Sequence, residues 1–381
     1  MRNTPEGLYS IKGAKFEAMD LPVIREVRGK EYMEFGVNNL FPQELIKLYD
    51  TSAINHTCID AIRDGIVGEG IVNYGEDYIN GDGETINEVF QKISLDYVLY
   101  GGYALNVIWN KEGTRIAEIY HLPFANVRSG KPDEEDRVNS YFYSSDWSKI
   151  RKYKPVQYAA FDITTTKGDD ASQIYYCKNY TPGNEVYPLP AYIGGVNDIQ
   201  LDARVSRFHN ANISNGLAPS MFVQFRNGIP NPEERRDIYR EIEDTFTGEE
   251  NAGRFFLAFS EPGKEMQVTP VENANDEYYI TLEQRITSRI LTAHRITSPL
   301  LLGIKEGAGF SSNSEEIITS YSHFMNTVVL PKQKKILSTF GYMLKLWGLN
   351  VTLEIEPTPI LIGTEADDPA IEENITNITA E

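Results

Sequence analysis

The sequence is poor in cysteine and lacks long apolar runs. Cys58 and Cys177 are the two cysteines among 381 residues, too few for a disulfide framework, so we expect both to be buried free thiols. No apolar run reaches the roughly 18 residues that a membrane-spanning helix needs. The N-terminal segment also lacks the basic-then-apolar order of a signal peptide. These absences predict that the protein is neither exported nor inserted into a membrane.

The chain also has fewer basic than acidic residues. The chain has 36 lysines and arginines against 55 aspartates and glutamates, which gives a formal net charge of −19. Tight, sequence-independent binding to nucleic acid requires basic side chains that displace the counterions of phosphate, so this composition argues against it. The charge is compatible with a protein that lets DNA slide past without holding it.

The motifs of common catalytic and metal-binding sites are absent from the sequence. Five histidines, His56, His121, His209, His294 and His323, are scattered singly, and none has the spacing of a zinc site. There is no G-x-S-x-G turn, and no G-x-G-x-x-G follows a predicted strand. We therefore predict no catalytic residue, no metal site and no cofactor.

Residues 276–347 have the clearest pattern in the chain, with a long helix, a glycine-rich loop and a second long helix. In the first helix, apolar residues recur every three or four positions and form one stripe. Pro299 cannot continue a helix, so we expect the first helix to end near Thr297. The stripe consists of Tyr279, Leu282, Ile286, Ile290, Ala293 and Ile296.

The loop at residues 300–310 contains three glycines around Lys305 and Glu306, which allows backbone conformations closed to other residues. A phosphate-binding loop would need a serine or threonine directly after the lysine and an apolar strand before the loop, and both are missing. Ser312 and Glu315 have the spacing of a capping box, which predicts that the next helix begins there.

The second long helix extends to Trp347, and Pro331 within it predicts a kink. Lys332, Lys334 and Lys335 follow the proline. Contact with nucleic acid and an ordinary solvated helix face explain these lysines about equally well. Gly348 is the expected stop of the helix.

The first half of the chain predicts short helices followed by a sheet. We expect residues 1–35 to be a partly ordered arm, and helices at 45–49, 54–66, with Ser52 as N-cap, and 86–100. A hairpin of 103–109 and 116–122 follows, and then strands within 127–147 and 158–180. Their many tyrosines predict a mostly antiparallel sheet with one wet face.

Residues 198–216 predict a weakly amphipathic helix whose thin stripe includes Ile199, Val205, Phe208 and Ile213. Such a helix favours packing against copies of itself. An insert follows with strands at 221–226, 254–259 and 265–271, and with a helix that the cap sequence at 231–234 predicts to begin there. A last strand is expected at 351–356, and the acidic tail beyond it is expected to be a flexible arm.

The order of these parts resembles the portal proteins of tailed bacteriophages. The matching motifs are HRITSPLLLG at 294–303, FSSNSEE at 310–316, Leu330-Pro331, LYGGYA at 99–104, Asn215-Gly216 before the strand at 221, and NAGR at 251–254. Each motif alone is weak, but their order and spacing over residues 45–350 are specific.

The resemblance implies an α+β fold with named parts. Residues 40–195 and 313–356 would form the wing, and the second segment would include the long kinked helix. The other parts would be an N-terminal arm (1–39), two stem helices (196–217 and 275–298), a small α/β clip (218–274), a tunnel loop (299–312) and an acidic C-terminal tail (357–381). The short C-terminus would leave little sequence for the helical crown of some portals.

The resemblance also implies a function. Portal proteins form rings, typically of about twelve subunits, at one capsid vertex. Double-stranded DNA enters through the ring during packaging and leaves through it at infection. The expected partners are further copies of the chain, the terminase large subunit, a head–tail adaptor, and the major capsid protein or a scaffold, with no membrane. The expected location is the virion, and the host cytoplasm during assembly.

The same resemblance assigns roles to individual residues. The tunnel loop facing DNA would contain Gly303, Lys305, Glu306, Gly307, Gly309 and Phe310. Contacts between neighbouring stems would involve Arg204, Arg207, Arg285, Ile286, Arg289 and Ile290. The clip would offer partner proteins a surface that includes Glu233, Glu234, Arg235, Arg236, Glu241 and Glu243.

Two other classes of protein remain as alternatives. Another ring-forming head–tail adaptor or neck protein would share the oligomeric, non-enzymatic character, but such proteins are usually smaller and lack the helix, loop and kinked-helix order. An enzyme acting on nucleic acid would need acidic metal ligands, and Asp367 and Asp368 in the tail are poorly placed to supply them. Cleavage that depends on a divalent metal would distinguish the enzyme from the portal.

Overall fold

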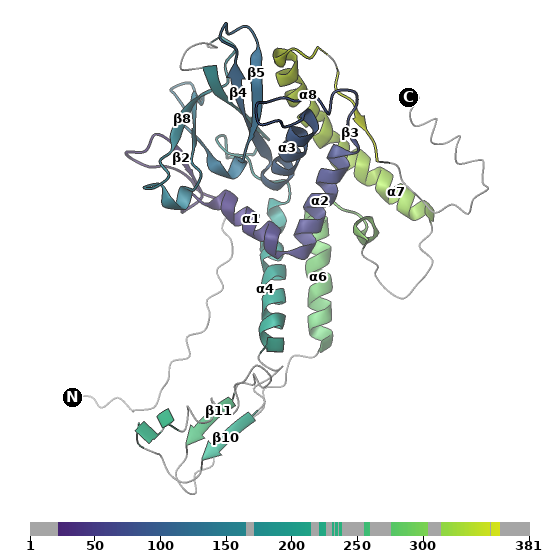
Figure 1. Ribbon diagram of the computed structural model, residues 1–381. Helices are drawn as coiled ribbons and strands as arrows, with labels where there is room; N and C mark the ends of the chain where they lie inside the picture. The colour runs from purple at the N-terminus through teal and green to yellow at the C-terminus, as the bar shows by residue number, and fades with distance from the viewer. Residues whose placement is uncertain are drawn as a thin grey trace. The chain divides into compact units, whose positions relative to one another are not determined.

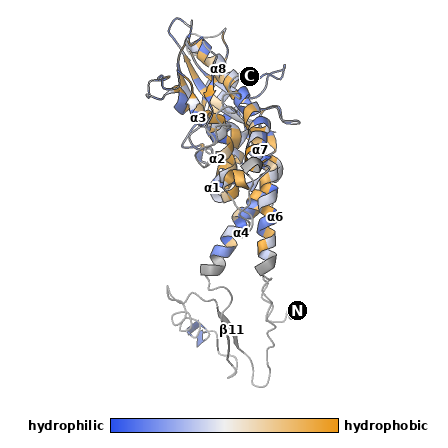
Figure 2. Cartoon of the chain, turned by 90° about the vertical axis from the view of Figure 1, so that its right-hand side faces the viewer, coloured by the Kyte–Doolittle hydropathy of each residue, from blue (hydrophilic) through white to orange (hydrophobic). Residues whose placement is uncertain are grey.

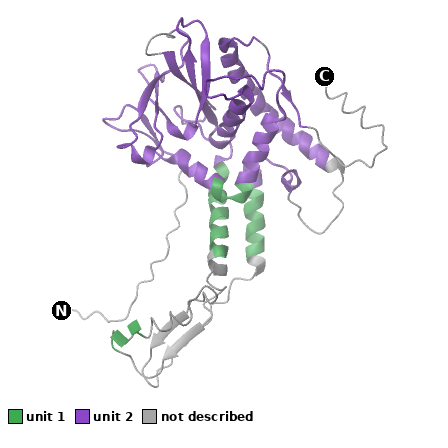
Figure 3. Cartoon of the chain, viewed as in Figure 1, with its two compact units in different colours: residues 1–21, 50–55, 194–290 green, residues 22–49, 56–193, 291–381 purple. Residues whose placement is uncertain are grey.

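The computed structural model describes residues 22–164, 171–214, 221–225, 255–259, 276–303, 314–350 and 352–358, and also 231, 233–234 and 236–237. The chain divides into two units (Figure 3). Unit 1 consists of residues 1–21, 50–55 and 194–290, and unit 2 of 22–49, 56–193 and 291–381. Neither unit is continuous in sequence.

Unit 2 is built on a six-stranded sheet with the order β5-β4-β9-β8-β7-β6 (Figure 1). All neighbours are antiparallel except β8 and β9, which are parallel. The predicted hairpin and the mostly antiparallel sheet are therefore confirmed. The strands are β4 (Gly102–Trp109), β5 (Ile116–Leu122), β6 (Val127–Ser129), β7 (Ser140–Tyr143), β8 (Val156–Ala160) and β9 (Ser172–Lys178).

The prediction that one face of the sheet is exposed to solvent holds only for part of it. In β4, Tyr103, Ala104, Leu105 and Val107 are fully buried although successive side chains point to opposite faces. Both faces of β4 are therefore covered. By contrast, β8 has only exposed or half-buried residues. The alternation of a strand does not reveal whether a helix will cover its second face.

Helices α1 (Phe41–Thr51), α2 (Ala53–Val67) and α3 (Ile86–Tyr100) confirm the three predicted helical segments. At the start of α3, Thr85 Oγ1 accepts from the Glu88 amide at 3.2 Å, and Glu88 Oε2 accepts from the Thr85 amide at 2.8 Å. Gly101 ends the helix with φ of 82°. A Cβ at Gly101 would lie 2.4 Å from the Leu189 carbonyl oxygen, so this position requires glycine.

The predicted N-terminal arm differs from the structure at residues 22–39. Strands β1 (Ile24–Glu26) and β2 (Met33–Phe35) form an antiparallel hairpin, and Tyr32 and Phe35 are buried. The Phe35 ring stacks on Tyr187 with a centroid distance of 4.1 Å. These contacts are with residues far away in sequence, so local periodicity gave no sign of them. Residues 1–21 lie outside the described residues.

Arg128 fixes the segment after this hairpin to the sheet. Its guanidinium is fully buried and donates to Asn39 Oδ1 at 2.6 Å and to the Asn39 carbonyl at 2.7 Å. It also donates to the carbonyls of Ala125 and Val127 at 2.9 and 2.8 Å. Burial lowers the pKa of Arg128 to about 10. The charge is therefore held by neutral acceptors and by the face of Trp147, 4.8 Å away.

The second long helix consists of three pieces, α7 (Ser314–Phe324), the π-helical segment η6 (Met325–Val329) and α8 (Leu330–Trp347). The sequence predicts a kink at Pro331, and a π-helical segment, a common site of helix kinks, ends two residues before it. At Gly65 of α2, an added Cβ would lie 2.9 Å from Val329 Cγ2, so α2 and η6 pack closely. The last strand is short, β12 (Ile355–Glu356) paired with β3 (Gly70–Ile71).

Unit 1 contains helix α4 (Val196–Ser214) and most of α6 (Asp276–His294). It also contains strands β10 (Met221–Phe225) and β11 (Phe255–Phe259), which pair in parallel. These elements match the predicted helices and two of the three predicted strands of the insert. The predicted strand at 265–271 lies outside the described residues.

Both cysteines are buried free thiols, as the sequence predicts. Burial raises the pKa of the Cys58 thiol to about 12, and that of the Cys177 thiol is also raised by burial. A thiol that stays protonated is a poor nucleophile and a poor metal ligand. The two side chains therefore act as small core residues.

Candidate functional site

Helices α4 and α6 lie side by side in unit 1 (Figures 1 and 2). The Phe208 and Tyr279 rings stack with centroids 6.0 Å apart, and His209 Nε2 lies 3.3 Å from Glu283 Oε1. Figure 2 shows both hydrophobic and hydrophilic residues along the two helices. The pair is therefore joined by polar and aromatic contacts as well as by an apolar stripe.

The stripe of α6 is covered within a single chain. Ile286 and Ile290 are 3% and 0% exposed, and Ile199 and Ala203 of α4 are 0% and 2% exposed. The role of Ile286 and Ile290 in contacts between subunits stays a prediction, and within one chain both side chains are already buried. An amphipathic stripe shows that a helix face is buried, but two helices of one chain bury it as well as two copies would.

A second apolar stripe, on α4, remains partly exposed to solvent. Leu201 and Phe208 are 38% and 47% exposed, and Val205 between them is half-buried. Their spacing of four and three residues places them on one helix face. Ile280 of α6 is also 55% exposed. The sequence interpretation merged Val205 and Phe208 with Ile199, although a separation of six residues between 199 and 205 does not fit one face.

The arginines predicted for subunit contacts lie mostly at the surface. Arg207, Arg285 and Arg289 are exposed, and Arg204 is half-buried. Arg289 Nη1 lies 3.4 Å from Asp198 Oδ1 of its own chain, and the arginine side chain is 73% exposed. An ion pair this exposed contributes little to stability. The role of these arginines in contacts between subunits stays a prediction.

Ser52 ties α4 to residues 50–55 of unit 1. Its hydroxyl donates to Asp202 Oδ2 at 2.6 Å and accepts from the Asn55 amide at 3.2 Å, which confirms its predicted role as an N-cap. Burial raises the pKa of the Asp202 carboxyl, and the nearby Glu283 adds to this effect. The hydrogen bond from Ser52 opposes it by favouring the carboxylate.

Helix α6 ends at His294, three residues before the predicted end at Thr297. Arg295 has φ of 62°, its amide donates to the Thr292 carbonyl at 3.0 Å, and the Ile296 amide donates to the Leu291 carbonyl at 2.9 Å. This is a Schellman motif, in which glycine usually takes the left-handed position. Because Arg295 is not glycine, the tertiary contacts of buried Leu291 and Ile296 determine this end.

The base of the glycine-rich loop is a short, well-defined turn. Ser298 Oγ accepts from the Leu300 amide at 3.3 Å, and a single turn of 3-10 helix, η5, spans Pro299–Leu302. Gly303 follows with φ of 73°. Gly303 is the one predicted tunnel-loop residue that the structure describes, since Lys305, Glu306, Gly307, Gly309 and Phe310 lie outside the described residues.

A buried, neutral histidine and two basic side chains lie near this base. His294 is 4% exposed and stacks on Tyr192 with centroids 4.6 Å apart, and burial, with a smaller effect of Lys332, lowers its pKa to about 3. Burial and then Arg295 lower the pKa of Lys332 to about 8. Lys332 Nζ donates to the Val328 carbonyl in the π turn at 3.0 Å. The sequence interpretation placed Lys332 on a solvated face and missed this role.

The described part of the predicted clip surface is exposed. Glu233, Glu234 and Arg236 are all exposed, whereas Arg235, Glu241 and Glu243 lie outside the described residues. Asn231 Oδ1 accepts from the amides of Glu233 and Glu234 at 3.0 and 2.9 Å. The helix start predicted at 231–234 is therefore confirmed by its cap.

Within the ranges that the structure describes, no three histidine, cysteine or acidic side chains gather in a way that could hold a metal ion. The same residues include no helix long and apolar enough to cross a bilayer. The geometry in hand is that of a helix pair with an open apolar face, followed by a loop with a rigid basic base.

Comparison with known proteins identifies the family. The family model described as phage portal protein matches residues 7–361. An uncharacterised protein of Rickettsia bellii (strain RML369-C) is 23% identical over 281 residues, which cover 73% of this chain and 67% of that protein. A chain in the virion of a native gene transfer agent particle has a TM-score of 0.55 at 17% identity, with 89% of this chain and 88% of that chain covered.

A chain in the neck of a native gene transfer agent particle has a TM-score of 0.53 at 18% identity, and 89% of each chain is covered. These two structures share the α+β fold with this chain. The family match extends over nearly the whole sequence and includes the helix, loop and π-interrupted helix described above. The chain therefore belongs to the phage portal protein family.

Proposed function

We propose that copies of this chain form a ring at one vertex of a capsid, and that double-stranded DNA passes through the ring. Membership of the portal family supports this function. One related particle neck was computed with C12 symmetry and another with C6 symmetry, which is compatible with twelve subunits. The chain acts in the virion as a structural component without catalysis, and it assembles in the host cytoplasm.

The partly exposed apolar face of α4 supports the proposal that copies of the chain assemble into a ring. Among the described residues, Leu201, Val205 and Phe208 form an apolar stripe that is exposed or half-buried, while Ile199 and Ala203 on the opposite side of α4 are buried. A helix with one stripe closed inside the chain and another open suits a wall of repeated copies. In a ring, each open stripe would meet the stem helices of the next subunit.

The loop after Gly303 supports the proposal that DNA passes through the ring. It joins the turn at 299–302 to α7, and its sequence has two further glycines and Lys305. Arg295 and Lys332 give its base a positive charge that attracts phosphate at short range, and salt screens this attraction beyond about 8–10 Å. The loop would line the channel and follow the moving DNA without holding it.

The remaining partners are assigned by analogy with the family. We propose that the clip, with exposed Glu233, Glu234 and Arg236, docks the terminase large subunit during packaging and a head–tail adaptor afterwards. The wing would face the major capsid protein or a scaffold. Arg235, Glu241 and Glu243 belong to the same proposed clip surface.

The assembly proposal is tested by placing charge on the open stripe. In the Leu201→Asp/Phe208→Asp variant, electron microscopy should show loss of rings while circular dichroism stays that of the folded chain, because both side chains are already partly exposed and the variant gives up only the Phe208–Tyr279 stack within the chain. Tyr180→Asp, at a residue 85% exposed in unit 2, is the matched control and should keep the rings. Normal rings from the double variant would contradict an interface on this face.

The channel proposal is tested by deleting residues 307–309. Rings should form at the normal level, since the deletion lies outside the helix pair, but DNA packaging or retention should fall. The readouts are ring counts by electron microscopy and nuclease-protected DNA per particle. Loss of the rings themselves would argue against a loop that only lines the channel.

A further inference from the structure

The outer face of α8 is basic in an acidic protein. Lys334, Lys335 and Lys345 are exposed on one side of the helix. Residues 317–353 include no aspartate or glutamate, although the chain has 55 acidic residues. Among the described residues, none of these three lysines forms an ion pair with a carboxylate. The described residues of unit 2 therefore give these three lysines no carboxylate partner.

Two shallow hollows lie along α8. One has Leu337, Gly341 and Leu353 in its lining, Lys345 beside them and a volume of about 330 Å³. The exposed Ser338 and the Tyr342 ring, which is 43% exposed, complete it. An apolar lining beside unpaired lysines suits a partner that has both apolar and acidic side chains.

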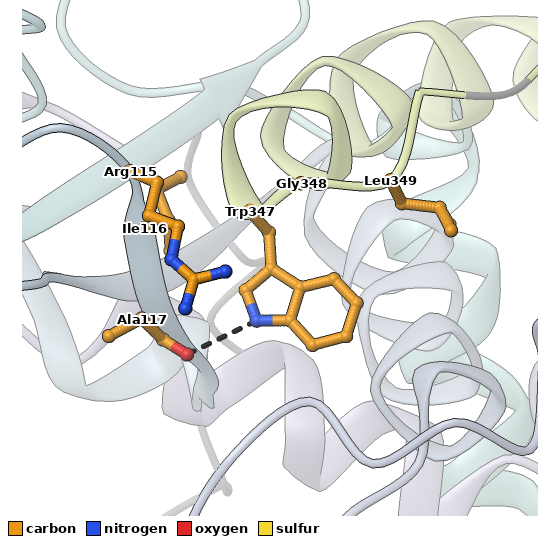
Figure 4. A pocket seen from close by; sticks show the side chains of 6 residues that line it. All are labelled: Arg115, Ile116, Ala117, Trp347, Gly348 and Leu349. Atoms are coloured by element: carbon orange, nitrogen blue, oxygen red, sulfur yellow. Dashed lines mark hydrogen bonds between the residues drawn. The ribbon is translucent and has the colours of Figure 1, made fainter.

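The second hollow lies at the end of α8 (Figure 4). Trp347, Gly348 and Leu349 meet Arg115 and the start of β5 there, around a volume of about 330 Å³. The Trp347 indole N–H donates to the Ala117 carbonyl at 3.1 Å, which fixes the ring at the rim. Arg115 is exposed, so this second hollow also has a basic side chain in its lining.

The C-terminal tail of this chain has the complementary composition. Residues 357–381 include six acidic side chains and no basic one. Ile371, Ile375 and Ile378 recur at the spacing of one helix face, after Asp368 and Pro369, which is a sequence typical of a helix start. An isolated helix this short is marginal in water, so it needs a surface to pack against. The family match ends at residue 361, before this segment.

We propose that residues 369–379 of this chain's own tail dock on the outer face of α8. The isoleucines enter the hollow at Gly341 and Leu353, and Glu372 and Glu373 lie beside the lysines of α8. Pro369 follows Thr358 by eleven positions, and an extended chain of that length spans up to roughly 36–40 Å. That reach is sufficient for a return to the face of the same chain.

Disulfide trapping in the full chain tests this docking. Ser338 lines the hollow and Asn374 flanks the isoleucine stripe, so the Ser338→Cys/Asn374→Cys variant should form a disulfide under mild oxidation. Cys58 and Cys177 are buried and do not compete. The control is Val37→Cys/Asn374→Cys, because Val37 is 61% exposed. Val37 follows the β1–β2 hairpin, whose strand β2 contacts β6. Strand β6 is at the opposite edge of the sheet from β5.

The expected result is a disulfide that forms at least about tenfold faster at Ser338 than at Val37, because docking raises the effective concentration. Adding Lys334→Glu/Lys345→Glu should remove this advantage, and Lys334→Arg/Lys345→Arg should keep it. Equal rates at Ser338 and Val37, or full trapping in the charge-reversed variant, would overturn the proposal. A product of monomer mass shows docking on the same chain, and a dimer shows docking of the same segment on a second copy.

Discussion

The sheet of unit 2 and the helix pair of unit 1 bury their apolar residues to different extents. In β4 the side chains on both faces are covered, and even Arg128 is fully buried with a hydrogen-bond acceptor for each of its nitrogens. In α4 one stripe is closed while Leu201 and Phe208 remain 38% and 47% exposed. In the described residues, the core of unit 2 is therefore buried within one chain, whereas the helix pair keeps apolar side chains partly exposed, which is the face that we propose contacts other copies.

The largest expected effect is that of Arg128→Ala, which tests how completely unit 2 buries its core. The substitution leaves the carbonyls of Ala125, Val127 and Asn39 without their buried donor, and it creates a cavity. We expect the free energy of unfolding to fall by roughly 3–5 kcal/mol, measured by chemical denaturation. A loss below about 1 kcal/mol would mean that water replaces the arginine and that this part of unit 2 is less tightly closed.

The second test asks whether the α6 stripe is closed within one chain. Ile290→Ala should lower the free energy of unfolding of the unassembled chain by about 2–4 kcal/mol, because the side chain is fully buried there. Ile280→Ala, at a residue 55% exposed, is the matched control and should change it by less than about 0.5 kcal/mol. Similar small effects at both positions would show that the stripe closes only on assembly.

The third test uses pH and concerns His294. Its folded pKa of about 3 lies below the usual 6.5, so between these values the unfolded chain binds a proton that the folded chain does not. Stability should therefore fall as the pH drops through 6.5 towards 3, by at most about 1.4 kcal/mol per pH unit. His294→Phe should flatten this part of the profile of unfolding free energy against pH. An unchanged slope would mean that His294 is protonated in the folded chain.

The smallest expected effect is at Arg289. Because the side chain is 73% exposed and its contact with Asp198 is 3.4 Å long, Arg289→Ala should change the free energy of unfolding by less than about 0.5 kcal/mol. Ring assembly, measured by electron microscopy, is the sharper readout. A clear loss of rings with unchanged stability would assign Arg289 to a neighbouring subunit after all, as the sequence interpretation expected.

Much of the local structure could be predicted from residue spacing alone. The cap of α3 at Thr85 and Glu88, its end at Gly101, the hairpin β4–β5 and the irregularity before Pro331 all follow from short-range chemistry. The N-terminal hairpin β1–β2 did not, because its side chains Tyr32 and Phe35 pack on residues more than a hundred positions away. No periodicity within ten residues encodes such a contact.

The sequence by itself determined the order of helix, glycine-rich loop and second helix, and with that order the portal family. Only the tertiary structure decided which apolar stripe is buried within the chain. Ile286 and Ile290 of α6 are buried within the single chain, while Leu201 of α4 is 38% exposed and Phe208, although its ring stacks on Tyr279 of α6, is 47% exposed. The physical reason is that spacing defines which residues share a helix face, and only the position of a second element determines whether that face is covered.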